Sequence, residues 1–100
     1  MKEVLSLVAA LIQALSSSAF AADINHGEAI VKRWCAECHV VAAGQNVSTE
    51  APPFSVVAKR PEFDAAKVAF FLLDPHPKMP NMQLSRTEVA DIAGYIATLK

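Results

Sequence analysis

The hydrophobic pattern of the chain is most regular near its C-terminus. Four apolar residues fall there on one face of a helix: Val89, Ile92, Ile96 and Leu99. Ser85 and Glu88 precede this face at the spacing of a capping box, in which each side chain bonds the backbone of the other residue. The pattern predicts a helix that begins at Ser85 and packs Tyr95 and the apolar face inward.

A second amphipathic pattern lies in the first half of the chain. One stripe of the predicted helix holds Ile30, Val31 and Trp34. Asn25 is the expected N-cap with Glu28 as its capping partner, and Asp23 is the alternative cap. We therefore expect a helix that begins near Asn25, runs through Trp34 into the Cys35–His39 run and buries this stripe.

The stretch between Asp64 and Pro75 is apolar nearly all round. Asp64 can cap a helix, and Asp74-Pro75 can end it, because the residue before a proline is driven away from helical angles. The apolar residues between them are Ala65, Val68, Ala69, Phe70, Phe71, Leu72 and Leu73. A helix with so many apolar positions is expected to be packed on more than one side.

Two segments lack a hydrophobic period and are rich in turn residues. Residues 41–53 contain a glycine, two prolines and small polar side chains, which predict a loop, and residues 54–58 suit a short helical turn. Residues 75–80 hold three prolines, which suit a stiff loop that presents one side chain. No stretch alternates as a strand does. The predicted fold class is therefore all-α, with three main helices and short turns.

Two glycines interrupt the predicted helices, Gly27 in the first and Gly94 in the last. A glycine inside a helix costs about 1 kcal/mol relative to alanine, so it needs a reason such as the close approach of another backbone. We expect the first and last helices to cross closely, with Gly27 against Gly94.

The N-terminal residues have the features of an export signal. Residues 4–15 form an apolar run, followed by three serines and by Ala19-Phe20-Ala21, which fits an A-x-A cleavage site. This predicts a signal peptide over residues 1–21 and one domain over residues 22–100. Glu3 follows Lys2, so the basic region is weak, and an uncleaved membrane anchor is the alternative, although the apolar run is short for a span.

Composition and charge narrow the classes of function. The chain has 100 residues, of which 53% are hydrophobic, and a formal net charge of -1. Removal of residues 1–21 takes away one charge of each sign, so the mature chain keeps a net charge of -1. These values fit one small globular domain, exclude a disordered tail and give no support to nucleic-acid binding.

The run Cys35-Ala36-Glu37-Cys38-His39 is the motif that carries chemistry. A C-x-x-C-H run is the attachment signature of c-type haem. Its two thiols meet the two vinyl groups of one porphyrin, and the imidazole that follows ligates the iron. The motif predicts one haem c, bound covalently through Cys35 and Cys38, and the buried macrocycle adds core area that so short a chain lacks.

Three other chemistries use a cysteine pair at this spacing. A thioredoxin-like redox pair is expected beside a βαβ pattern, which the sequence lacks. A zinc site needs a second pair of ligands, and His26 and His76 do not have the required spacing. A structural disulfide between Cys35 and Cys38 is possible in an exported chain, and a disulfide and a metal site remain the alternatives to haem.

The order of these parts resembles the class I c-type cytochromes, in particular the small bacterial ones with a single haem. The resemblance covers residues 22–100: a helix carrying C-x-x-C-H, a proline loop, a middle helix, a methionine loop and a last helix with the run A-D-I-A-G-Y-I. It implies the cytochrome c fold wrapped around the haem. In that family a glycine before the motif packs on the last helix near its aromatic residue, and Gly27 and Tyr95 hold those places. Gly94 departs from the alanine usual in the family.

The resemblance also implies how His39 is oriented. Pro52 matches a proline whose carbonyl region accepts a hydrogen bond from the proximal histidine, and Phe54 matches the apolar residue two positions later. Pro53 is the register-shifted alternative to Pro52. Arg60 matches a basic residue that lies near a haem propionate in relatives.

The second axial ligand of the iron follows from the same resemblance. The family pattern favours the methionine just before Pro80, which is Met79, and the flanking prolines suit a loop that holds its thioether in place. Met82 and His76 are the rivals. The implied metal ligands are therefore His39 and Met79.

The implied function is outer-sphere transfer of one electron. With His39 and Met79 on the iron, no substrate reaches the metal without displacing a ligand, which argues against an enzyme. We expect a soluble periplasmic monomer that meets respiratory or dehydrogenase redox partners transiently, without nucleic acid and without a membrane span after signal cleavage. The alternatives are an electron-transfer subunit permanently docked to a dehydrogenase or oxidase, and a haem protein whose iron is open because Met79 does not ligate it.

Overall fold

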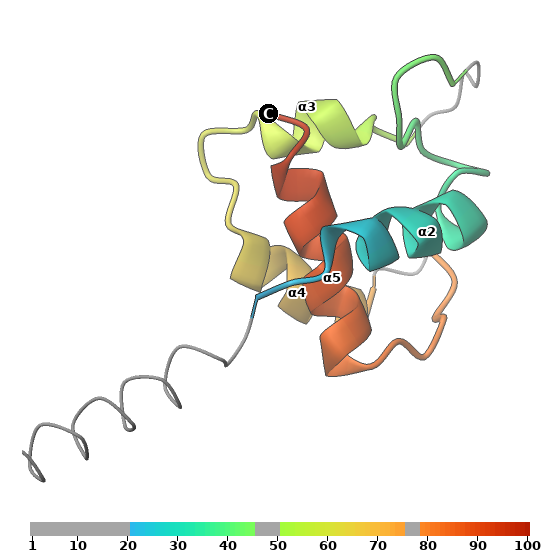
Figure 1. Ribbon diagram of the computed structural model, residues 1–100, viewed down its shortest axis with the longest axis vertical. Coiled ribbons are helices and arrows are strands. Elements are labelled where there is room, and N and C mark those ends of the chain that lie inside the picture. The colour runs from blue at the N-terminus through green and yellow to red at the C-terminus, as the bar shows by residue number, and fades with distance from the viewer. Residues whose placement is uncertain (1–20, 46–50, 76–78) are drawn as a thin grey trace, which may run out of the picture.

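The computed structural model describes residues 21–45, 51–75 and 79–100. Within these ranges the chain forms four helices and no strand, and the helices are α2 (Ile24–Trp34), α3 (Phe54–Ala58), α4 (Ala65–Leu73) and α5 (Arg86–Ala97). The other three helices all contact α5, which lies among them (Figure 1). The predicted all-α class is confirmed.

Some sequence predictions fall where the structure gives no description. Residues 1–20 of the predicted signal peptide and His76 lie outside the described residues. Among the residues that are described, no helix is both long enough and apolar enough to cross a membrane.

Side-chain caps set the start of the two later long helices. At α5 the Ser85 hydroxyl accepts from the Glu88 N–H at 3.1 Å, and the Glu88 carboxylate accepts from the Ser85 N–H at 2.9 Å. At α4 the Asp64 carboxylate accepts from the Lys67 N–H at 3.1 Å. Each bond satisfies a backbone donor that has no partner inside the first turn of a helix. The capping box and the Asp64 cap are therefore confirmed.

The start of α2 differs from the prediction. The cap is Asp23, whose carboxylate accepts from the His26 N–H at 3.0 Å, so Asn25 as N-cap was wrong. The Asp23 N–H in turn donates to the Asp91 carboxylate of α5 at 2.8 Å. This tertiary bond holds Asp23 in the extended conformation that an N-cap needs, and the local sequence does not contain that information.

Helix α5 supplies the largest share of the core. Its buried residues are Val89, Asp91, Ile92, Ala93, Tyr95 and Ile96. The same core contains residues from each of the other helices: Ile30, Val31, Phe54, Ala58 and Leu72. The inward face predicted for the last helix is thus confirmed, and this face sets where the other helices lie.

The crossing of α2 and α5 depends on Gly27. A Cβ atom at this position would lie 2.5 Å from the carbonyl carbon of Asp91 and closer still to its oxygen. A Cβ at Gly94 would instead meet Ala22 Cβ at 2.7 Å and Ile24 Cδ1 at 3.1 Å. Gly27 does lie against the last helix, as expected, but its pairing with Gly94 was wrong, because the two glycines serve separate contacts.

Helix α4 is packed on one side. Leu72 is its buried residue, whereas Phe70 is 78% exposed and Phe71 and Leu73 are also exposed. The expectation of packing on more than one side was wrong, because an apolar sequence does not say how many neighbours a helix has. Trp34, expected on the buried stripe of α2, is half exposed.

A buried carboxylate joins the start of α2 to α5. Asp91 Oδ2 lies 2.7 Å from His26 Nδ1. This hydrogen bond is the main reason why the pKa of His26 is raised above 6.5. Burial works to raise the pKa of Asp91, but the bonds from His26 and from the Asp23 amide outweigh it, so that pKa is lowered below 3.8. No sequence pattern predicted this contact, because the two residues are 65 positions apart.

Gly27→Ala is expected to lower the free energy of unfolding by about 2 kcal/mol or more, because the Asp91 carbonyl cannot move without parting the two helices. Helix propensity alone would raise it by about 1 kcal/mol. Chemical denaturation of the purified protein measures the difference. Gly94→Ala is the comparison and should cost less, since its neighbours are side chains. A Gly27→Ala protein as stable as the wild type would contradict the close crossing.

His26→Gln is expected to destabilise the protein on the acid side of neutrality and less at high pH. A raised pKa means that the contribution of His26 is fully present below its unfolded value of 6.5 and is lost as pH rises through the folded value. The lowered pKa of Asp91 keeps the carboxylate charged below pH 3.8. Urea titrations should therefore show the largest difference in the free energy of unfolding between variant and wild type at about pH 5, and the smallest at about pH 9.

The matched control for this experiment is Asn25→Gln, which changes an exposed amide next to His26. Its difference from wild type should not depend on pH. If His26→Gln lost the same amount of stability at both pH values, the ion pair with Asp91 would not be the cause.

Candidate functional site

Contrary to the prediction, the C-x-x-C-H motif does not continue the helix but folds into a tight turn directly after α2 ends at Trp34. The Cys35 N–H donates to the Val31 carbonyl at 2.9 Å, and the N–H groups of Cys38 and His39 donate to the Cys35 carbonyl at 3.1 Å and 2.9 Å. Cys35 and His39 are buried, whereas Cys38 is exposed. The turn brings both sulfurs and the imidazole to the wall of one cavity.

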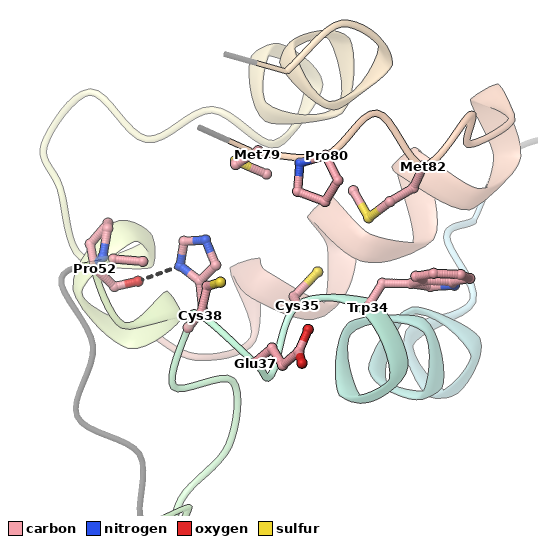
Figure 2. Close-up of a pocket in the computed structure, with 10 residues that line it drawn as sticks. Trp34, Cys35, Glu37, Cys38, Pro52, Met79, Pro80 and Met82 are labelled. Carbon is pink, nitrogen blue, oxygen red and sulfur yellow. Dashed lines mark hydrogen bonds between the residues drawn. The ribbon is translucent and has the colours of Figure 1, made fainter. Parts of the chain in front are cut away.

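This first cavity has a volume of about 580 Å³. Figure 2 shows Cys35 and Cys38 on one side of it, and Met79, Pro80 and Met82 on a segment at the opposite side. Trp34 stands at the motif side, which explains why an apolar side chain there is half exposed. The turn on α2 therefore faces the methionine loop across an open space.

A second cavity of about 450 Å³ adjoins the first. The two share four lining residues: Cys35, His39, Pro52 and Met79. Apolar residues make up much of the second wall, and they are Phe54, Val57, Phe63, Val68, Phe71, Leu72 and Ile96. Both volumes lie within the roughly 300–1,000 Å³ typical of ligand pockets. Because they share these residues, we treat the two cavities as one cleft.

The His39 ring is fixed by a backbone carbonyl. Its Nδ1 lies 2.7 Å from the carbonyl oxygen of Pro52, the bond drawn as a dashed line in Figure 2. A carbonyl only accepts, so Nδ1 carries the proton and Nε2 keeps a lone pair that can bind a metal. The ring also lies against Phe54, with centroids 4.8 Å apart. The partner is Pro52, as the family resemblance implies, and not Pro53.

The environment of Cys35 does not suit thiol–disulfide exchange. Burial, with a smaller effect of Cys38, raises the pKa of the Cys35 thiol to about 11. The thiolate is the reactive form, and redox-active C-x-x-C pairs have lowered pKa values. Within the described ranges, no three His, Cys, Asp or Glu side chains gather into a metal-binding cluster.

The two methionines have different positions in the cleft. Met79 lines both cavities and packs against the hydrophobic core, whereas Met82 lines only the first cavity. His39 also lines both cavities. Met79 is therefore the methionine that shares the whole cleft with the imidazole. Arg60 lies in the wall of the second cavity, together with Lys67.

The segment after His39 is held by bonds that sequence reasoning missed. The buried Tyr95 hydroxyl donates to the Val41 carbonyl at 2.6 Å, and the Phe54 N–H donates to the Val40 carbonyl at 2.9 Å. Gln45 bonds the same segment through its side-chain amide. Helical spacing identified Tyr95 as an inward residue, but no period or motif singles out Gln45 in a loop.

The residues that line the cleft fit a haem held by thioether bonds. An apolar macrocycle needs apolar walls, and the second cavity supplies them. The iron needs an imidazole nitrogen with a free lone pair, and the Pro52 bond selects that tautomer of His39. The vinyl groups need two thiols, and Cys35 and Cys38 border the same space.

Comparisons with known proteins agree with this assignment of the cleft. Residues 22–96 match the family described as cytochrome c oxidase, cbb3-type, subunit III. The chain is also 63% identical over 86 residues to cytochrome c-552 of Bradyrhizobium diazoefficiens, in an alignment covering 85% of this chain and 83% of that protein. No solved structure is significantly similar to the chain. The chain therefore belongs to the c-type cytochromes, in the family described as subunit III of cbb3-type cytochrome c oxidase.

Proposed function

We propose that the chain is an electron carrier that holds one haem c through Cys35 and Cys38, with His39 and Met79 as the axial ligands. The observation that supports this most directly is the cleft whose shared walls contain Cys35, His39, Pro52 and Met79. When bound, the haem iron supplies a reversible one-electron couple. Membership of the c-type cytochromes and the similarity to a cytochrome c-552 support the same function.

The roles of the two ligands follow from their chemistry. Donation of the Nδ1 proton to the Pro52 carbonyl makes Nε2 of His39 a stronger ligand and fixes the plane of the ring. The thioether of Met79 is a soft ligand that favours the reduced state. His39 and Met79 would together ligate the iron and leave no site on it for a substrate, which supports a carrier and not an enzyme.

The walls of the cleft tune this chemistry. Phe63, Phe71 and Leu72 line one side of the cleft, and an apolar wall of low dielectric strengthens the effect of any nearby charge. Arg60 and Lys67 are the cations of the same wall. We assign Arg60 to the neutralisation of a haem propionate, the role that its place in the cleft supports.

We also propose that the chain is exported and meets redox proteins in the periplasm. Residues 1–21 act as a cleaved signal peptide, and residues 22–100 work in the periplasm as a monomer. Electrons enter and leave near the exposed Cys38 during brief encounters with redox proteins, which typically bury less than about 1,200 Å².

A second candidate function is a subunit permanently docked to an oxidase or dehydrogenase. The observation that favours it is the outer face of α4, where Phe70 is 78% exposed and Leu73 is also exposed. Purification under mild conditions separates the two candidates, since a free carrier is recovered alone and a subunit is recovered with its partner.

Met79→Ala is expected to abolish the sulfur-to-iron charge-transfer band of the oxidised protein completely. The same change should let the reduced protein bind carbon monoxide without denaturant, because an axial position is then open. Met82→Ala is the matched control and should keep the band, since Met82 lines only the first cavity. Optical spectra of the oxidised and reduced proteins measure both effects.

Other outcomes of this experiment have distinct meanings. Loss of the band in Met82→Ala alone would assign the ligand to Met82 and contradict the choice of Met79. Carbon monoxide binding by the native wild type would indicate an open iron. A colourless wild type would contradict the proposed cofactor.

A further inference from the structure

We infer that Gln45 is a positioning residue for the haem-binding turn, because its side-chain amide holds the Ala36 and His39 carbonyls and so fixes the backbone of the proximal ligand. The inference rests on the proposed function, in which His39 ligates the haem iron. It adds a residue outside the C-x-x-C-H motif to the machinery that orients this ligand.

The contacts of Gln45 use the whole amide group. Its Oε1 accepts from the Val41 N–H at 2.9 Å, and its Nε2 donates to the His39 carbonyl at 2.8 Å and to the Ala36 carbonyl at 3.1 Å. Two carbonyls can only accept and a backbone N–H can only donate, so the three partners determine which end of the amide faces which group. A carboxylate lacks the donors and an ammonium lacks the acceptor.

His39 is held at three points, and Gln45 provides one of them. The His39 N–H donates to the Cys35 carbonyl at 2.9 Å, and the ring Nδ1 bonds the Pro52 carbonyl at 2.7 Å. Gln45 holds the third group, the His39 carbonyl. Because it also bonds Ala36, it links the inside of the motif to the segment that leaves it. Loss of this bridge would remove the Gln45 donor from the Ala36 and His39 carbonyls.

The bonds that Tyr95 and Phe54 make to this segment do not reach the motif. Tyr95 and Phe54 bond the carbonyls of Val41 and Val40, and so anchor the segment to α5 and α3. Removing the Tyr95 hydroxyl should therefore loosen the segment while leaving both Gln45 bonds to the motif in place. This difference separates a residue that positions His39 from one that only closes a loop.

The first test is Gln45→Ala in the haem-loaded protein. The solvent exchange of the His39 Nδ1 proton, followed by NMR in the reduced state, should be about tenfold faster or more, since a bridge between partly buried polar groups is lost. Tyr95→Phe is the matched control, and its exchange rate is compared with that of the wild type under conditions that give both proteins the same free energy of unfolding. Under these conditions the His39 Nδ1 proton of the control should exchange at close to the wild-type rate.

The second test is Gln45→Glu, which keeps the shape and the Val41 contact. Ionised, the new carboxylate faces the carbonyls of Ala36 and His39 and repels them; protonated, it regains one donor. The hyperfine-shifted haem methyl signals of the oxidised protein report the plane of the His39 ring. In Gln45→Glu these haem methyl signals should move toward their wild-type positions as the pH falls. This movement should be larger than any pH-dependent movement of the same signals in the wild type. This variant keeps the inference testable if Gln45→Ala does not fold.

Three results would overturn the inference. The first is a wild-type exchange rate for the His39 proton in Gln45→Ala, and the second is an equal acceleration in Tyr95→Phe at matched stability. The third is a set of haem methyl signals in Gln45→Glu that follows the wild type at every pH. Failure of the proposed function is a separate result, because the wild-type protein would then lack the haem signals altogether.

Discussion

The structure depends first on the hydrogen bond between His39 Nδ1 and the Pro52 carbonyl. This bond at 2.7 Å joins the turn at the end of α2 to the segment before α3, and it leaves Nε2 as the nitrogen that can bind a metal. A backbone carbonyl can only accept a hydrogen bond and does not titrate. It therefore sets the tautomer of His39 at every pH, as a titrating side chain could not. The ability of His39 to bind a metal through Nε2 depends on this constraint.

Helix α5 holds the two ends of this arrangement in place. At its first half, the Asp91 carbonyl packs against Gly27 and the Asp91 carboxylate bonds Asp23 and His26, which fixes the start of α2. At its second half, the Tyr95 hydroxyl bonds the Val41 carbonyl, which fixes the segment that follows His39. Contacts with α5 therefore fix the chain on both sides of the motif. The walls of the cleft are apolar, so a bound macrocycle would complete the hydrophobic core in this small domain.

How much the sequence reveals depends on the range of the interaction involved. Local patterns predicted the helices, the capping box at Ser85 and the haem motif, because the residues that define each feature lie close together in the sequence. Pro52 came only from a family resemblance. The sequence could not reveal the partner of Gly27 or the ion pair of His26, and it offered Asp23 only as the alternative to Asn25 as the cap. All three features depend on Asp91, more than sixty residues away. Gln45 is local, but nothing in a polar loop marks one amide as a bridge.

The central claim is that a haem attached to Cys35 and Cys38 is part of the folded protein. The most direct test is the intact mass of the exported protein under denaturing conditions, where any group that is not covalently bound is lost. The account predicts the mass of the polypeptide plus one haem, and removal of residues 1–21 changes the polypeptide mass independently. A denatured chain with the mass of the polypeptide alone would contradict the account.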